Sequence, residues 1–66
     1  MLDIEKIKKL LESKNMTQAQ LGDSVGVTES MISYVLRGFK KPSLEVTKRI
    51  ADTLGVKIDD IVKEAK

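Results

Sequence analysis

The sequence predicts an all-α protein, folded as a compact bundle of five short helices. Turn signals divide its 66 residues into five pieces, and each piece carries apolar residues at the spacing of one helix face. Apolar and polar residues nowhere alternate over a length that favours a strand. Because no repeat, low-complexity stretch or linker interrupts this pattern, we interpret residues 1–66 as a single domain.

Composition narrows how such a chain can be stabilised and what chemistry it can perform. It is 41% hydrophobic and 33% charged, and it contains neither Cys nor His. Disulfides, the usual zinc sites and the common His-dependent catalytic triads are therefore excluded. The core must come from helix packing, to which self-association can add. No window resembles a secretion signal or a membrane span, so we expect a cytoplasmic protein.

The first two helices have recognisable ends. Asp3 is a suitable N-cap for the first, which stops near Asn15, a residue that tolerates left-handed backbone. The second has a stronger start, because Thr17 followed three residues later by Gln20 is the capping-box pattern. Gly26 then ends this second helix.

A third helix is predicted to begin about three residues after the second one ends. Thr28 is its N-cap, and Val27 can pack against Ile32 as a hydrophobic staple. The connection is so short that the two helices cannot be collinear, and Gly26 supplies the unusual backbone angles for a steep crossing. Gly38 ends the third helix.

The last two helices follow a basic loop at residues 39–41. Pro42 and Ser43 open the fourth helix and Gly55 closes it. The fifth piece has acidic residues in its first turn, but its cap is poor because Lys57 stands where Ser or Asp would be expected. Its narrow apolar stripe consists of Ile58, Ile61, Val62 and Ala65.

The third helix has one side that suits the major groove of DNA. At about 100° per residue its apolar side chains share one arc. The opposite arc carries Ser30, Ser33, Tyr34 and Arg37. Short hydroxyls let a helix approach a surface closely, while Tyr34 and Arg37 reach further and can donate hydrogen bonds. Base edges in the major groove present matching donors and acceptors.

Other polar residues are placed to meet phosphates beside that groove. Gln18 and Thr28 stand at helix N-termini, which favour anions, and Lys40 and Lys41 follow the end of the third helix. The net charge is only +2, so the arrangement of charge matters more than its amount. Glu29 can accept a hydrogen bond from the N4 amine of cytosine, or it caps the helix or pairs with Gln18.

Several of these residues also have a structural interpretation. Lys40 and Lys41 can simply keep a loop solvated. Phe39, the single Phe, either folds back onto the core or touches DNA or a partner chain. The C-terminal stripe of residues 58–65 covers the bundle, and a chain this small can also share it with a second copy. We therefore expect a homodimer.

The two capped helices joined at Gly26, together with the helices around them, resemble the Cro/CI-type (XRE-like) helix-turn-helix domains of phage and bacterial transcriptional regulators. The resemblance covers roughly residues 4–62, and residues 17–37 look like the two-helix unit of that family. Gly26 matches its turn glycine. The resemblance implies a lambda-repressor-like five-helix bundle that binds double-stranded DNA, often as a two-fold dimer on a palindromic operator.

The resemblance also implies roles for single residues. Gln18 would contact a phosphate and support the start of the third helix. The residues facing bases or the adjoining backbone would be Thr28, Glu29, Ser30 and Ser33, with Tyr34 and Arg37 beside them. Two positions depart from the family pattern. Gly22 replaces the usual Ala, which costs about 1 kcal/mol of helix stability if exposed unless closer helix contact offsets it. Leu36 stands where the family often has Glu.

The expected function is sequence-specific binding of double-stranded DNA by a small transcriptional regulator, a repressor that blocks polymerase at its operator. The alternative is a protein-interaction module, such as an antitoxin or an adaptor with the same fold. The low net charge favours the alternative slightly, whereas the N-caps and the basic loop favour DNA. We expect no enzymatic activity, cofactor, metal or small-molecule substrate.

Overall fold

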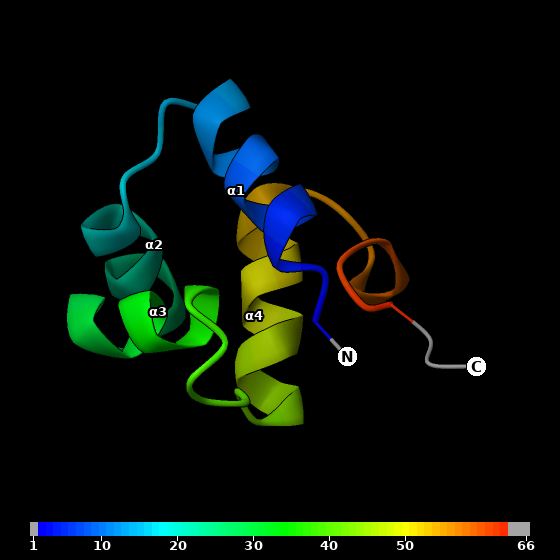
Figure 1. Ribbon diagram of the computed structural model, residues 1–66. Helices are drawn as coiled ribbons and strands as arrows, with labels where there is room; N and C mark the ends of the chain where they lie inside the picture. Colours follow the sequence, from blue (N-terminus) through cyan, green and yellow to red (C-terminus); the bar gives the residue numbers. More distant parts are fainter. Residues whose placement is uncertain (1, 64–66) are drawn as a thin grey trace.

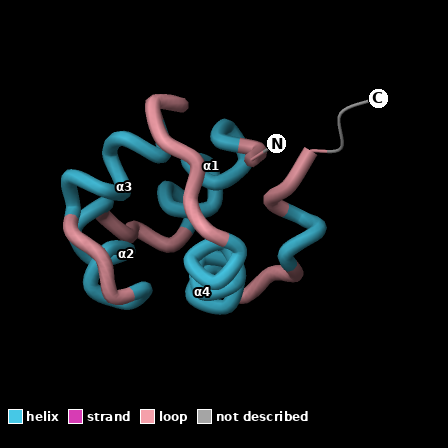
Figure 2. Tube along the Cα trace, turned by 90° about the horizontal axis from the view of Figure 1, so that it is seen from below, coloured by secondary structure: helices cyan, strands magenta, loops and turns pink. Residues whose placement is uncertain are grey.

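The computed structural model describes residues 2–63, and in that range it contains four α-helices and one 3-10 turn. In chain order these are α1 (Ile4–Ser13), α2 (Gln18–Val25), α3 (Glu29–Leu36), α4 (Leu44–Leu54) and the 3-10 turn η1 (Ile58–Asp60). Helix α4 is central, because it packs against α2 on one side and η1 on the other (Figure 1). Figure 2, which looks nearly along α4, shows that α3 runs across it. The all-α prediction is confirmed.

The predicted N-caps all make their hydrogen bonds. Asp3, Thr28 and Ser43 each accept from the backbone N–H three residues further on, at 3.2, 3.1 and 3.2 Å. Thr17 and Gln20 form the full capping box: the Thr17 hydroxyl accepts from the Gln20 N–H at 3.1 Å, and the Gln20 side chain accepts from the Thr17 N–H at 2.9 Å. Each helix start is therefore fixed locally by its own sequence.

Left-handed residues terminate α1 and α2 as the sequence predicts. Asn15 has a φ of 52° and Gly26 a φ of 80°. The Gly26 N–H donates to the carbonyl of Gly22, so the turn closes directly onto the last turn of α2. Figure 1 shows α3 running across the lower end of α2, the steep crossing expected from so short a connection.

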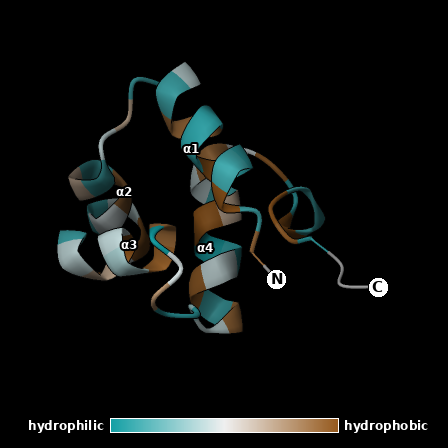
Figure 3. Ribbon diagram, viewed as in Figure 1, coloured by the Kyte–Doolittle hydropathy of each residue, from teal (hydrophilic) through white to brown (hydrophobic). Residues whose placement is uncertain are grey.

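The core lies where α1, α2, α3, α4 and the C-terminal segment meet. Its buried members are Ile7, Leu11, Leu21, Val25, Ile32, Leu36, Ile50, Ala51, Leu54 and Ile61. Thr47 is the buried polar residue among those described, and its hydroxyl donates to the Ser43 carbonyl at 2.9 Å. Figure 3 shows α3 brown where it approaches α4 and pale or teal along much of its remaining length. One side of α3 is therefore anchored and the other is left exposed.

The predicted fifth helix forms only the single 3-10 turn η1, so the expected five-helix count is not met in residues 2–63. Lys57 precedes the turn and offers no side-chain cap, as the sequence indicated. The Asp60 carboxylate instead accepts from the Lys57 N–H at 3.1 Å. Ala65, the last member of the predicted stripe, lies outside the described residues.

A long-range pairing explains why the helix does not continue past η1. Leu2 and Val62 form an isolated antiparallel bridge, and the Asp3 N–H donates to the Ile61 carbonyl at 2.8 Å. Lys63 adds an ion pair to Asp3 at 3.9 Å. These extended-chain hydrogen bonds use backbone groups that a longer helix would need for itself.

Candidate nucleic-acid interface

The connection between α2 and α3 is packed backbone against backbone. Gly22 is buried, and its carbonyl accepts from the Val27 N–H at 2.9 Å. A Cβ atom at Gly22 would lie 2.8 Å from the Val27 carbonyl oxygen and 3.2 Å from the carbonyl of Thr28. The absence of a side chain at Gly22 therefore lets α2 approach the start of α3 this closely.

Six of the nine predicted site residues line one shallow, polar hollow that is open to solvent. They are Gln18 from α2 together with Glu29, Ser30, Ser33, Tyr34 and Arg37 from α3 and its C-cap. Residues from two helices, spread over 20 positions of sequence, thus meet on one surface. A surface of this kind offers hydroxyl, amide, carboxylate and guanidinium groups to a polar ligand.

The hollow's side chains are not engaged with the rest of the protein. Within residues 2–63, none of the six makes a side-chain hydrogen bond or ion pair to another residue. In particular, Glu29 does not pair with Gln18, which removes one of the structural interpretations of Glu29. Gln18 and Ser33 are half-buried, and the other four are exposed. Their donors and acceptors are available to a ligand.

The inner side of helix α3 packs against the core. Ile32, Val35 and Leu36 are 1%, 2% and 4% exposed, so the inner side of the helix is locked into the core. Thr28 caps its first turn by accepting from the Met31 N–H at 3.1 Å. The Thr28 hydroxyl is exposed and its proton is not used in this bond, so it can still donate to a phosphate oxygen. The burial of the inner side and the N-cap therefore fix the position of α3 on the protein.

Lys40 and Lys41 do not line the hollow. They are exposed in the loop between α3 and α4, where they border apolar depressions around Pro42. The loop nevertheless begins directly after α3, because the Phe39 N–H donates to the Tyr34 carbonyl at 2.9 Å. The predicted residues therefore form two parts, a polar hollow on α2 and α3 and a basic loop beyond the end of α3.

Arg49, which the sequence did not indicate as important, connects α2 to α4. Arg49 of α4 donates through Nη1 to the Val25 carbonyl at 3.4 Å and through Nη2 to Glu45 Oε1 at 3.0 Å. It thereby brings a positive charge to the C-terminus of α2, where the helix dipole favours a cation. The spacing of Glu45 and Arg49 could have indicated their pair. The contact to Val25, 24 residues away, has no sequence signal.

Two other kinds of site find no support in the described part of the chain. Among residues 2–63, no three carboxylates gather as ligands for a metal ion. In the same range no helix has both the length and the apolar character needed to cross a bilayer.

Two short helices joined by a tight glycine turn, the second presenting a free polar side, define a helix-turn-helix unit. A model of a helix-turn-helix family matches residues 7–61. The chain is 38% identical over 56 residues to an uncharacterized HTH-type transcriptional regulator of Archaeoglobus fulgidus, covering 85% of this chain and 79% of the relative. An uncharacterized HTH-type transcriptional regulator of Methanocaldococcus jannaschii is also 38% identical over 56 residues, covering 85% of both chains. The chain therefore belongs to the helix-turn-helix family, in the XRE-like form that its sequence resembles.

Proposed function

We propose that the chain binds double-stranded DNA sequence-specifically and regulates transcription as a small repressor, without catalysis. The observation that carries this proposal is the polar hollow, where residues of α2 and α3 present unpaired donors and acceptors on one solvent-open surface. Membership of the helix-turn-helix family and the names of the two relatives support DNA binding and transcriptional regulation.

In this proposal α3 lies in the major groove. Ser30 and Ser33 come closest to base edges because their side chains are short, and Tyr34 and Arg37 reach the groove wall. Glu29 accepts from a cytosine amine at the start of the helix. These contacts would carry the sequence preference of the protein.

Phosphates are bound around the groove. The N-terminal residues Gln18 and Thr28 face one strand, and Lys40 and Lys41 face the backbone beyond the end of α3. From Ser30 to Leu44 the chain carries three cations and no carboxylate, although the whole protein has a net charge of only +2. The three cations are therefore not offset by an acid within this segment, although Glu29 and Glu45 border it.

We further propose that two copies bind a palindromic operator. A dimer would place its two α3 helices in successive major grooves about 34 Å apart. Occupation of such a site blocks polymerase by steric exclusion, so no second domain or bound cofactor is needed for repression.

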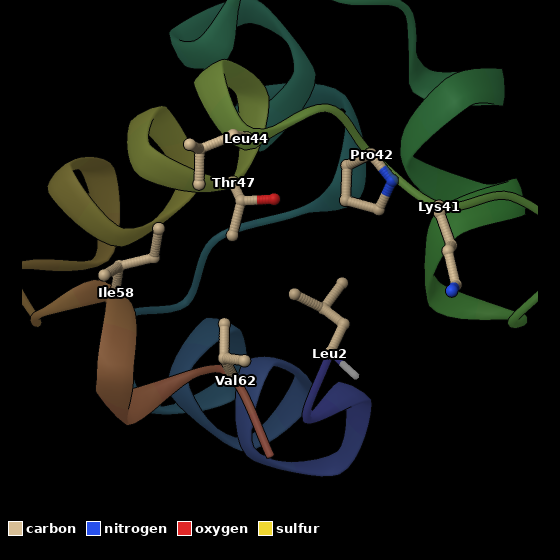
Figure 4. A pocket seen from close by; sticks show the side chains of 7 residues that line it. All are labelled: Leu2, Lys41, Pro42, Leu44, Thr47, Ile58 and Val62. Carbon is tan, nitrogen blue, oxygen red and sulfur yellow. The ribbon is translucent and has the colours of Figure 1, made fainter. Parts of the chain in front are cut away.

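An apolar groove supplies a surface for this dimer (Figure 4). It is lined by Leu2, Lys41, Pro42, Leu44, Thr47, Ile58 and Val62. Leu44 is 71% exposed, so it adds apolar surface to this groove. The predicted C-terminal stripe is divided here: Ile61 is buried in the core, whereas Ile58 and Val62 face the groove and remain half-buried. A second copy would cover the exposed part.

A protein-interaction module remains the second candidate. The observation that favours it is the exposure of two large apolar side chains, Phe39 at 74% and Leu44 at 71%. A protein partner would bury apolar surface and depend weakly on salt, whereas DNA binding releases counterions and falls steeply as salt rises. Salt dependence therefore separates the two functions.

The test begins with selection of bound duplexes from a random oligonucleotide pool, followed by fluorescence anisotropy at several salt concentrations. We expect Arg37→Ala to weaken binding to every duplex and to lower the salt slope by about 1. Ser33→Ala should change the preference among sequences instead. Lys57→Ala is the charge-matched control, because Lys57 is exposed beside η1, which packs on α4 away from α2 and α3.

Two outcomes would contradict the proposal. Wild-type affinity that does not change with ionic strength would exclude binding to the DNA backbone. Equal effects of Arg37→Ala and Lys57→Ala would show that the hollow is not where the duplex binds.

A further inference from the structure

Phe39 has no place in the core. It is the single Phe of the chain, and its side chain is 74% exposed, the largest value among the exposed large apolar residues. Of the two alternatives, folding back onto the core is therefore wrong. An aromatic ring left in water at this position loses the burial that normally stabilises such a residue. Its alternatives are contact with DNA or with a partner chain.

The backbone of Phe39 is fixed. Gly38 adopts a left-handed φ of 80°, the Gly38 N–H donates to the Val35 carbonyl at 3.1 Å, and the Phe39 N–H donates to the Tyr34 carbonyl at 2.9 Å. This is the hydrogen-bond pattern of a Schellman helix end, in which the residue after the glycine lies beside the residue three positions before the cap. Phe39 is therefore held at the same end of α3 as Tyr34, which itself is 50% exposed.

The charge around Phe39 matches a polyanion. Arg37 stands two residues before it, and Lys40 and Lys41 follow it directly. All three are exposed, and the nearest carboxylates along the chain are Glu29 and Glu45. Glu45 is in addition paired with Arg49 at 3.0 Å. An exposed apolar ring flanked in sequence by cations fits a surface that alternates phosphates with apolar groups, which describes the edge of a DNA groove.

We propose that Phe39 is an apolar DNA-contact residue, whose ring packs against a deoxyribose or a thymine methyl group while Lys40 and Lys41 bind the flanking phosphates. The inference rests on the proposed DNA-binding function and adds an apolar contact residue to it. Because Phe39 is the third residue after the end of α3 at Leu36, the ring lies at the margin of the DNA-facing side of α3 rather than at its centre. It would be shielded from water only in the complex.

The test compares Phe39→Ala with two reference variants on the best duplex from a random pool, at several salt concentrations. We expect Phe39→Ala to weaken binding about tenfold, equivalent to about 1.4 kcal/mol, without changing the salt slope, because no ion pair is lost. Phe39→Leu, which keeps apolar bulk, should retain most of the affinity. Lys41→Ala should lower the salt slope by about 1.

Two controls separate this role from others. Thermal unfolding of Phe39→Ala should match the wild type, because an exposed ring adds little to the core. In wild-type protein, replacing single thymines by uracil removes one methyl group at a time without altering the protein. A loss of affinity at one position, absent in Phe39→Ala, would identify the methyl group as the contact, and no loss at any position would assign the ring to deoxyribose.

The inference is overturned if Phe39→Ala binds as tightly as wild type while wild-type affinity falls with salt, a result that leaves the DNA-binding function standing. It is also overturned if Phe39→Ala changes the dimerisation constant in sedimentation experiments and leaves the affinity of each dimer for DNA unchanged. Wild-type binding that is insensitive to salt would instead contradict the proposed function itself.

Discussion

Replacement of Gly22 by Ala tests how closely the two helices of the DNA-binding unit must approach. Glycine inside an exposed helix is ordinarily unfavourable, and its replacement by Ala stabilises the helix by about 1 kcal/mol. Gly22, however, is buried against the turn that follows its own helix. The same substitution should therefore have the opposite sign here.

The magnitude follows from the distances. A Cβ at position 22 would lie 2.8 Å from the Val27 carbonyl oxygen and 3.2 Å from the Thr28 carbonyl. Both neighbours are backbone, and the hydrogen bond from the Val27 N–H to the Gly22 carbonyl holds them in place. Overpacking of this kind costs about 1–3 kcal/mol. After subtraction of the gain in helix propensity, we expect Gly22→Ala to lower the free energy of unfolding by about 1 kcal/mol.

Urea unfolding followed by circular dichroism measures this difference, and for so small a domain a loss of 1 kcal/mol lowers Tm by about 4–8 °C. Ser24→Ala is the matched control, because Ser24 is exposed on the same helix and gains propensity without a clash. Displacement of the turn should also weaken binding to the selected duplex. A Gly22→Ala protein more stable than wild type would refute the close approach.

Three further predictions concern single interactions. Thr28→Ala should cost about 1 kcal/mol of stability and weaken DNA binding, with both recovered in Thr28→Ser, as measured by urea unfolding and anisotropy. Arg49→Ala should lower the free energy of unfolding by up to about 1 kcal/mol at low salt, and by more than Glu45→Ala does, because only Arg49→Ala also removes the hydrogen bond to the Val25 carbonyl. Urea unfolding at two salt concentrations compares the two variants. Equal losses of stability would argue against that hydrogen bond. Leu44→Lys should weaken dimerisation in analytical ultracentrifugation without lowering Tm, because its side chain is exposed; an unchanged dimerisation constant would argue against the groove as the interface.

The helix starts and the turns could be predicted because their causes are local. Thr17, Gln20 and Thr28 act on backbone groups three residues away, and the left-handed residues Asn15 and Gly26 terminate helices by their own conformation. The partners in these interactions lie within a few residues of each other, so they can be predicted without knowledge of the tertiary fold.

The conformation of the predicted fifth helix could not be predicted correctly, because it depends on hydrogen bonds to a segment that is distant in sequence. The apolar spacing of residues 58–65 is helical, but Leu2 pairs with Val62 and the Asp3 N–H binds the Ile61 carbonyl. These partners are about 60 residues apart in sequence, and periodicity carries no information about them. The Arg49 contact to Val25 escaped prediction for the same reason.

The polar hollow was predictable for a different reason. A short helix packed on a core has one buried side, so its remaining residues must lie on the exposed side. Once Ile32, Val35 and Leu36 are assigned to the core, helical geometry alone places Ser33 and Arg37 on the opposite side. The same geometry says nothing about residues beyond the helix end, which is why the alternatives for Phe39 stayed open until its exposure was known. A side chain in a loop is positioned by turn conformation, here the left-handed conformation of Gly38. The core therefore fixes the position of the α3 side chains, whereas the Schellman hydrogen bonds of the loop fix the position of Phe39.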